Sequence, residues 1–134
     1  MAEITLEARI DSLSKVLAFL DEQLEMMDCT PKTQIQIDVA VEEMYVNVAS
    51  YAYGDGVGPV TVRVEESAPR TVSITLIDEG VPYNPLAKPD PDVTLSAEER
   101  GIGGLGIYMV KKSMDDMLYE YRDGKNIVTL IKAF

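Results

Sequence analysis

Two side chains in one helical segment have the types and the spacing to act on a phosphorylated ligand. Glu43 and Asn47 are four residues apart in "AVEEMYVNVASYAY" (residues 40–53), so in a helix they stack one above the other. An asparagine oxygen suits Mg²⁺, which keeps most of its waters and shares substrate phosphates. A glutamate can accept a proton from a hydroxyl or a water. Taken alone, however, the pair is more typical of a solvated helix flank.

A second acidic motif follows an apolar strand in "VSITLIDEGVPYNP" (residues 72–85). Asp78 can accept a hydrogen bond from an exocyclic amine such as that of adenine, and a hydrogen bond to a charged group is worth about 1.5–3 kcal/mol. Gly80 would let a planar base lie close to the backbone. Aspartate and glycine are also turn residues, and alone this motif is more typical of a turn.

The third motif is the glycine run in "EERGIGGLGIYMV" (residues 98–110), which leads directly into an apolar helical pattern. Backbone N–H groups with so few side chains around them can surround phosphate oxygens, and a helix N-terminus adds positive charge. A structural turn or a loosely packed linker has the same appearance. The run therefore identifies a phosphate site only in combination with other motifs.

Composition narrows the chemistry. The chain has 134 residues, which is the usual size of one domain, and it contains no histidine, so carboxylates must carry any acid–base catalysis. The net charge of −11 argues against binding to nucleic acid and suits a basic protein partner. We expect a cytoplasmic protein without a membrane span, because the chain has no long apolar run and no signal-peptide pattern. The single cysteine, Cys29, excludes an intrachain disulfide.

The spacing of apolar residues predicts the elements that position these motifs. Strands are expected at residues 3–10, 60–66, 71–78, 117–121 and 127–134, and helices at 12–27, 31–52 and 105–114. A long irregular segment, residues 80–103, is typical of a functional loop. This order predicts an α+β fold, a two-layer sandwich with helices on one face of a mostly antiparallel sheet.

The second helix carries two apolar stripes. Ile37, Val41, Met44 and Val48 form the stripe that should face the sheet. A second stripe, nearly opposite, contains Ile35, Val39 and Val46. It is either covered by the long loop or used as a contact surface.

Together, the three motifs resemble those of the GHKL ATPase superfamily, which includes gyrase and the histidine kinases. The closer resemblance is to its small stand-alone branch, the anti-sigma factor serine kinases of bacterial partner-switching systems. "VEEMYVNVASYAY" resembles the N box of that family, and "DEGVPYNP" and "ERGIGGLGIYMVKKSMD" resemble its two glycine boxes. The resemblance covers about residues 3–134 and implies a single Bergerat-type ATPase domain over residues 1–134, with an ATP lid at about 81–103.

The resemblance also implies site roles. Asn47 would coordinate Mg²⁺, Glu43 would be the catalytic base, and Asp78 would bind the adenine amine beside Gly80. Arg100 would reach the terminal phosphate as a second catalytic residue. The remaining binding residues would be five around the phosphates and one in the last strand that completes the adenine pocket: Gly101, Gly103, Gly104, Leu105, Gly106 and Thr129.

The function implied by the resemblance is that of an ATP-binding anti-sigma factor with Mg²⁺-dependent serine/threonine protein kinase activity. It would phosphorylate an anti-anti-sigma protein, sequester a sigma factor and form a homodimer. The alternative is a regulator of the same fold whose nucleotide gates protein binding without catalysis. A histidine kinase catalytic domain is disfavoured by the missing histidine, and a purely structural adapter predicts no ATP binding.

Three features depart from the family pattern. Tyr51 stands where the family commonly has a histidine, and the extra glycine in "GIGGLG" leaves the phosphate-contacting register open. The predicted lid is acidic, which repels ATP unless nearby cations offset it. The acidic residues are Asp90, Asp92, Glu98 and Glu99, and the candidate cations are Lys88, Arg100, Lys111 and Lys112. Lys111 and Lys112 are equally typical of solvated helix positions.

Overall fold

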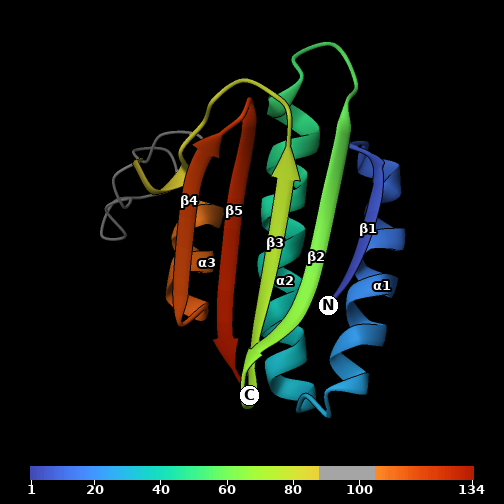
Figure 1. Ribbon diagram of the computed structural model, residues 1–134, viewed down its shortest axis with the longest axis vertical. Helices are drawn as coiled ribbons and strands as arrows, with labels where there is room; N and C mark the ends of the chain where they lie inside the picture. The colour runs from blue at the N-terminus through green and yellow to red at the C-terminus, as the bar shows by residue number, and fades with distance from the viewer. Residues whose placement is uncertain (88–104) are drawn as a thin grey trace.

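The computed structural model describes residues 1–87 and 105–134, and in this part of the chain five strands form one antiparallel sheet (Figure 1). The sheet order is β1-β2-β3-β5-β4. The strands are β1 (Ala2–Glu7), β2 (Pro59–Ala68), β3 (Thr71–Asp78), β4 (Asp116–Arg122) and β5 (Lys125–Ala133). The hairpins β2–β3 and β4–β5 meet through β3 and β5, so the end of β3 lies beside the start of β5.

Three helices form the second layer, on one face of this sheet (Figure 1). They are α1 (Leu13–Met26), α2 (Pro31–Asn47) and α3 (Leu105–Ser113), and α2 lies between the other two and contacts both. Short helical segments flank them: η1 (Ile10–Ser12), η2 (Val48–Ala52), which is a π-helix, and η3 (Pro85–Ala87). The predicted α+β two-layer sandwich is confirmed.

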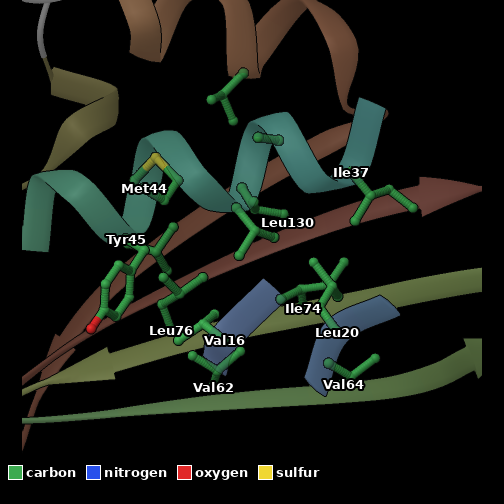
Figure 2. Packing of buried hydrophobic residues seen from close by; sticks show 14 of the residues in the cluster. Val16, Leu20, Ile37, Met44, Tyr45, Val62, Val64, Ile74, Leu76 and Leu130 are labelled. Atoms are coloured by element: carbon green, nitrogen blue, oxygen red, sulfur yellow. The ribbon is translucent and has the colours of Figure 1, made fainter. Parts of the chain in front are cut away.

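The core lies between the two layers and follows the two periodicities of the sequence. Alternate residues of β2 and β3, such as Val62 and Ile74, are buried against the helices. Ile37 and Met44 of α2 are buried on the face of the helix that packs on the sheet, as the first apolar stripe predicted (Figure 2). Val41 of the same stripe is also completely buried. Each fully buried side chain of this kind contributes roughly 1.5–3 kcal/mol.

The edges of several elements differ from the prediction. β1 ends at Glu7 rather than Ile10, because Ile10 begins η1 and is 53% exposed. In α1 the completely buried residues are Val16, Leu20 and Leu24, whereas Leu13 and Leu17 pack only at the border of the core.

The second stripe of α2 faces away from the core. Ile35 is 63% exposed and Val39 is 46% exposed. Residues 88–104, which include most of the predicted lid, lie outside the described part of the chain, so cover by the lid is not tested. On the core side, the completely buried Tyr45 donates its hydroxyl to the Arg9 carbonyl at 2.7 Å and joins α2 to the segment after β1.

Candidate functional site

A pocket opens where α2 passes into η2, beside the end of β3 and the start of β5. Its free volume is about 130 Å³. Most of the wall is apolar, and polar groups come from Asn47, Asp78, Asn126 and two tyrosines. A pocket with apolar walls and a few convergent polar groups suits a flat ring with a polar edge. The lining residues are Met44, Asn47, Val48, Tyr51, Ala52, Asp78, Val81, Tyr83, Pro85, Ile107, Asn126 and Val128.

Asp78 is the acidic group of the pocket and is only 5% exposed. Its Oδ1 accepts two hydrogen bonds, from the Gly80 N–H at 2.9 Å and from Asn126 Nδ2 at 2.9 Å. Within residues 1–87 and 105–134, no group donates a hydrogen bond to Oδ2. Burying a carboxylate is costly unless donors compensate it. Here the donors fix one oxygen, and the other stays available to a ligand.

Asn126 is a site residue that the sequence reasoning missed. It lies directly opposite Asp78 in the β3–β5 ladder and is 4% exposed. Besides Asp78, its Nδ2 donates to the Val81 carbonyl at 2.9 Å, and its Oδ1 accepts from the Tyr119 hydroxyl at 2.6 Å. One signal could have found it, because Asn126 is a polar residue in the alternating series that continues with Val128 and Leu130.

Thr129, expected to complete the pocket, is placed on the other face of β5. Its neighbours Val128 and Leu130 are buried against the helices, and side chains alternate along a strand. The Thr129 hydroxyl lies instead 3.4 Å from that of Thr75 on β3. The structure therefore does not bring Thr129 to Asp78, and Asn126 occupies the corresponding place in the pocket.

Gly80 lies where the backbone after β3 packs closely against the backbone of Ala52. A Cβ at Gly80 would lie 2.2 Å from the carbonyl oxygen of Ala52, and the same oxygen accepts the Val81 N–H at 3.0 Å. The chain after β3 thus packs directly on the end of η2, which needs a residue without a side chain. Gly80 itself is absent from the described pocket lining, where Ala52 and Val81 stand instead.

The π-helical turn η2 shapes the opposite wall. It follows Asn47 directly and brings Val48, Tyr51 and Ala52 to the pocket. Segments of this kind are frequent at functional sites. Just beyond it, the Tyr53 hydroxyl donates to the Pro59 carbonyl at 2.5 Å and accepts the Glu79 N–H at 2.7 Å. This bridge joins η2 to the start of β2 and the end of β3.

Glu43 lies one helical turn before Asn47 and against the first turn of α3. A Cβ at Gly106 would come within 2.2 Å of Glu43 Oε2. Gly106 is therefore the position at which α3 makes room for this carboxylate. The N-terminus of a helix carries partial positive charge, which favours a negative group there. Asn47 and Glu43 thus connect the pocket at Asp78 with the beginning of α3.

The remaining predicted residues are not tested. Arg100, Gly101, Gly103 and Gly104 lie outside the described residues, as do Lys88 and the acidic positions of the predicted lid. Leu105 begins α3. In the last turn of α3, Lys112 Nζ lies 5.5 Å from the centre of the Tyr108 ring. Residues 1–87 and 105–134 contain no cluster of three or more acidic or cysteine side chains able to hold a metal, and no helix among them is long and apolar enough to cross a membrane.

The fold is a two-layer sandwich with an apolar pocket at the end of β3, and comparison with known proteins assigns its family. The chain belongs to the histidine kinase-like ATPase domain family, whose family model matches residues 6–132. This family membership agrees with the resemblance inferred from the three motifs.

Two curated relatives are kinases by name. The serine/threonine-protein kinase BtrW of Bordetella bronchiseptica is 26% identical over 100 residues, covering 74% of this chain and 70% of the relative. The serine-protein kinase RsbW of Bacillus mycoides is 28% identical over 94 residues, covering 67% of this chain and 58% of the relative. The match to RsbW therefore spans less than two thirds of that protein's length.

The chain is also similar to a solved structure, the histidine kinase AdeS of Acinetobacter baumannii. The match covers 99% of this chain and 68% of the AdeS chain. The sequence identity is 13% and the TM-score is 0.47, so the fold assignment rests on the family match and on the sheet and helix order.

Proposed function

We propose that this chain binds ATP with Mg²⁺ and transfers the terminal phosphoryl group to a serine or threonine of a partner protein. The observation that carries the proposal is Asp78, whose Oδ1 is held by two donors while Oδ2 receives none from the described residues. A fixed acceptor in an apolar pocket matches the exocyclic amine of adenine. The family match to ATPase domains supports the nucleotide.

The base and the phosphates would occupy two ends of the same site. The adenine ring would lie between Val48 and Ala52 of η2 and Val128 of β5, all of which line the pocket. The phosphates would extend toward the first turn of α3, where backbone N–H groups and the helix dipole favour negative charge. Gly101, Gly103, Gly104, Leu105 and Gly106 would surround them, and Arg100 would contact the terminal phosphate.

Asn47 would contribute one oxygen to Mg²⁺. A single amide ligand fits this ion, since Mg²⁺ is commonly held by one or two protein oxygens together with waters and substrate phosphates. When bound, Mg²⁺ would neutralise part of the negative charge of the phosphates. Asn47 lines the pocket one turn beyond Glu43, which is consistent with this role.

Glu43 would accept the proton of the serine hydroxyl as the hydroxyl oxygen attacks the terminal phosphorus, and ADP would leave. Its place against α3 brings it to the end of the site where the phosphates would lie. A glutamate in this role also accounts for phosphoryl transfer in a chain that contains no histidine. General base catalysis of this kind contributes about 10²–10⁴ in rate.

The partners follow from the family resemblance. The phospho-acceptor would be an anti-anti-sigma protein, and a homodimer of this chain would sequester a sigma factor. ATP and sigma factors meet in the cytoplasm, so the proposed activity belongs there. The net charge of −11 favours a partner with a basic surface.

The test measures two quantities, the ATP affinity by calorimetry with Mg²⁺ and the transfer of radiolabelled phosphate to an anti-anti-sigma protein. We expect Glu43→Gln to lower transfer at least about 100-fold while ATP affinity changes little. The matched control is Glu42→Gln, an exposed neighbour on α2 that should retain full transfer. Absence of ATP binding by the unchanged chain would refute the proposal.

A second candidate is a nucleotide-gated binding module without catalysis. The contact of Glu43 with the first turn of α3 favours it, because a carboxylate at a helix N-terminus can serve the structure alone. In that case ATP would bind, no phosphate would be transferred to any partner, and Glu43→Gln would lower the stability of α3. Detectable transfer that Glu43→Gln abolishes would exclude this candidate.

A further inference from the structure

Asn126 is the point at which three separate parts of the pocket meet. Its amide group contacts the carboxylate of Asp78 at the end of β3 and the hydroxyl of Tyr119 on β4. It also contacts the backbone of the segment after β3, at the Val81 carbonyl and the Tyr83 N–H. These contacts lie within 2.6–3.1 Å, and the amide is almost completely buried.

The network leaves the amide one orientation. An asparagine has two N–H donors and two acceptor sites on its oxygen. Both donors face acceptors, Asp78 Oδ1 and the Val81 carbonyl, and the oxygen faces two donors, Tyr119 and the Tyr83 N–H. A flipped amide would set oxygen against two acceptors. A fully satisfied buried network of this kind is rigid.

Tyr119 helps to keep that orientation. Burial raises the pKa of the Tyr119 phenol above its ordinary value. The hydroxyl therefore keeps its proton across the physiological range and remains a donor to Asn126 Oδ1.

We infer that Asn126 is a positioning residue that sets the base selectivity of the pocket, by holding Asp78 Oδ1 so that Oδ2 is presented to a ligand amine. This inference rests on the proposed function, since it concerns the same nucleotide site. Without Asn126, Asp78 Oδ1 keeps only the Gly80 N–H, and the carboxylate can rotate away from the pocket. A nucleotide that carries the amine then loses more affinity than one that lacks it.

The experiment compares ATP with purine riboside triphosphate, which lacks the 6-amino group, by calorimetry with Mg²⁺ on the full chain. We expect the unchanged chain to prefer ATP by about tenfold or more, the equivalent of one charged hydrogen bond. Asn126→Ala should weaken ATP about tenfold, change the analogue less than threefold and so remove most of the preference. Asn84→Ala is the matched control, because this exposed asparagine bonds the Leu86 N–H and should leave the preference unchanged.

Tyr119→Phe provides a second, milder variant should Asn126→Ala fail to fold. It removes one donor to the Asn126 oxygen and should lower the preference for ATP about two- to threefold, as expected for a neutral hydrogen bond. Equal weakening of both nucleotides, or an unchanged preference in Asn126→Ala and Tyr119→Phe, would overturn the role of Asn126 alone. Failure of the unchanged chain to bind either nucleotide would overturn the proposed function together with this inference.

Discussion

Asp78 and Asp38 are two aspartates in different regions of the molecule, and they differ in the hydrogen bonds that their carboxylates receive. Asp78 lies at the end of β3, where two N–H donors hold its Oδ1. Asp38 lies on α2 beside Asp21 of α1, and its Oδ1 is buried and receives no hydrogen bond from the described residues. The two donors hold the Asp78 carboxylate in one position as a hydrogen-bond acceptor. The Asp38 carboxylate keeps one oxygen without a hydrogen bond from that part of the chain.

The neighbours of Asp38 are themselves acidic. Asp21 on α1 shares a hydrogen bond with it, and Glu42 adds negative charge from α2. Burial and then these neighbours raise the pKa of Asp38 to about 7. Gln34 Nε2 donates to Asp21 Oδ1 at 3.1 Å, so the pair is best satisfied when Asp38 carries the proton. The contrast indicates that hydrogen-bond donors, rather than burial, distinguish Asp78, the carboxylate proposed to bind adenine, from Asp38.

The largest expected effect that tests this contrast comes from Asp78→Asn. The change removes a charged acceptor worth about 1.5–3 kcal/mol, so ATP affinity should fall by about 10- to 150-fold in calorimetry with Mg²⁺. The matched change, Asp38→Asn, should leave ATP affinity within twofold. Equal losses of affinity in the two variants would break the distinction between the two carboxylates.

A smaller effect is expected from Gly80→Ala. The new Cβ would lie 2.2 Å from the Ala52 carbonyl oxygen, so the segment after β3 must move and the Gly80 N–H bond to Asp78 must lengthen. We expect a loss of about 1–3 kcal/mol in the free energy of unfolding, measured by urea denaturation, together with weaker ATP binding. Gly56→Ala is the control, since its Cβ would meet its nearest atom at an ordinary 3.4 Å. Equal free energies of unfolding for the two variants would contradict the claim that Gly80 has no room for a side chain.

The smallest effect concerns the pH dependence of stability. The pKa of Asp38 rises from an ordinary 3.8 to about 7 in the folded state, so the folded chain holds a proton that the unfolded chain releases. This contribution to stability is complete below pH 3.8 and is lost as the pH rises through 7. Because the carboxyl is partly open to water, which screens it, we expect a loss of only about 1–2 kcal/mol between pH 5 and pH 8.

Asp38→Asn should remove that pH dependence and make the chain more stable at pH 8. The free energy of unfolding in urea at the two pH values measures it, and Asp55→Asn, which changes an exposed aspartate, is the control for net charge. The titration of Cys29 must be measured in parallel, because burial and, to a smaller extent, the charge of Asp38 raise the pKa of its thiol. If the free energy of unfolding of Asp38→Asn depended on pH as it does in the unchanged chain, Asp38 would not be the group that holds the proton.

The parts of the site that the sequence predicted are those that short-range patterns encode. A helical period places Glu43 and Asn47 on one face, and an apolar strand with a polar end identifies Asp78. The alternation of β5 could have marked Asn126 as a polar residue on the buried face, but it could not reveal the contact with Asp78. That contact depends on the register between β3 and β5, whose paired residues are 48 positions apart. The same register explains Thr129, since the alternation of β5 turns it away once Asn126 faces Asp78.

The glycines were predicted to approach the base and the phosphates, and the structure shows in addition which protein groups two of them approach. At Gly80 and Gly106 a side chain would collide with a neighbouring group of the protein. The approaching groups are the Ala52 carbonyl and the Glu43 carboxylate, both from the α2–η2 segment. Which atoms approach a glycine depends on how distant elements pack, and local sequence patterns do not contain that information.

The most direct measurement of the central claim is a crystal structure of the chain with a non-hydrolysable ATP analogue and Mg²⁺. The account predicts the adenine amine within about 2.7–3.2 Å of Asp78 Oδ2, with Asp78 Oδ1 still bonded to Asn126. It also predicts Asn47 on the metal and the phosphates at the start of α3. A nucleotide bound elsewhere, or an adenine whose amine points away from Asp78, would contradict it.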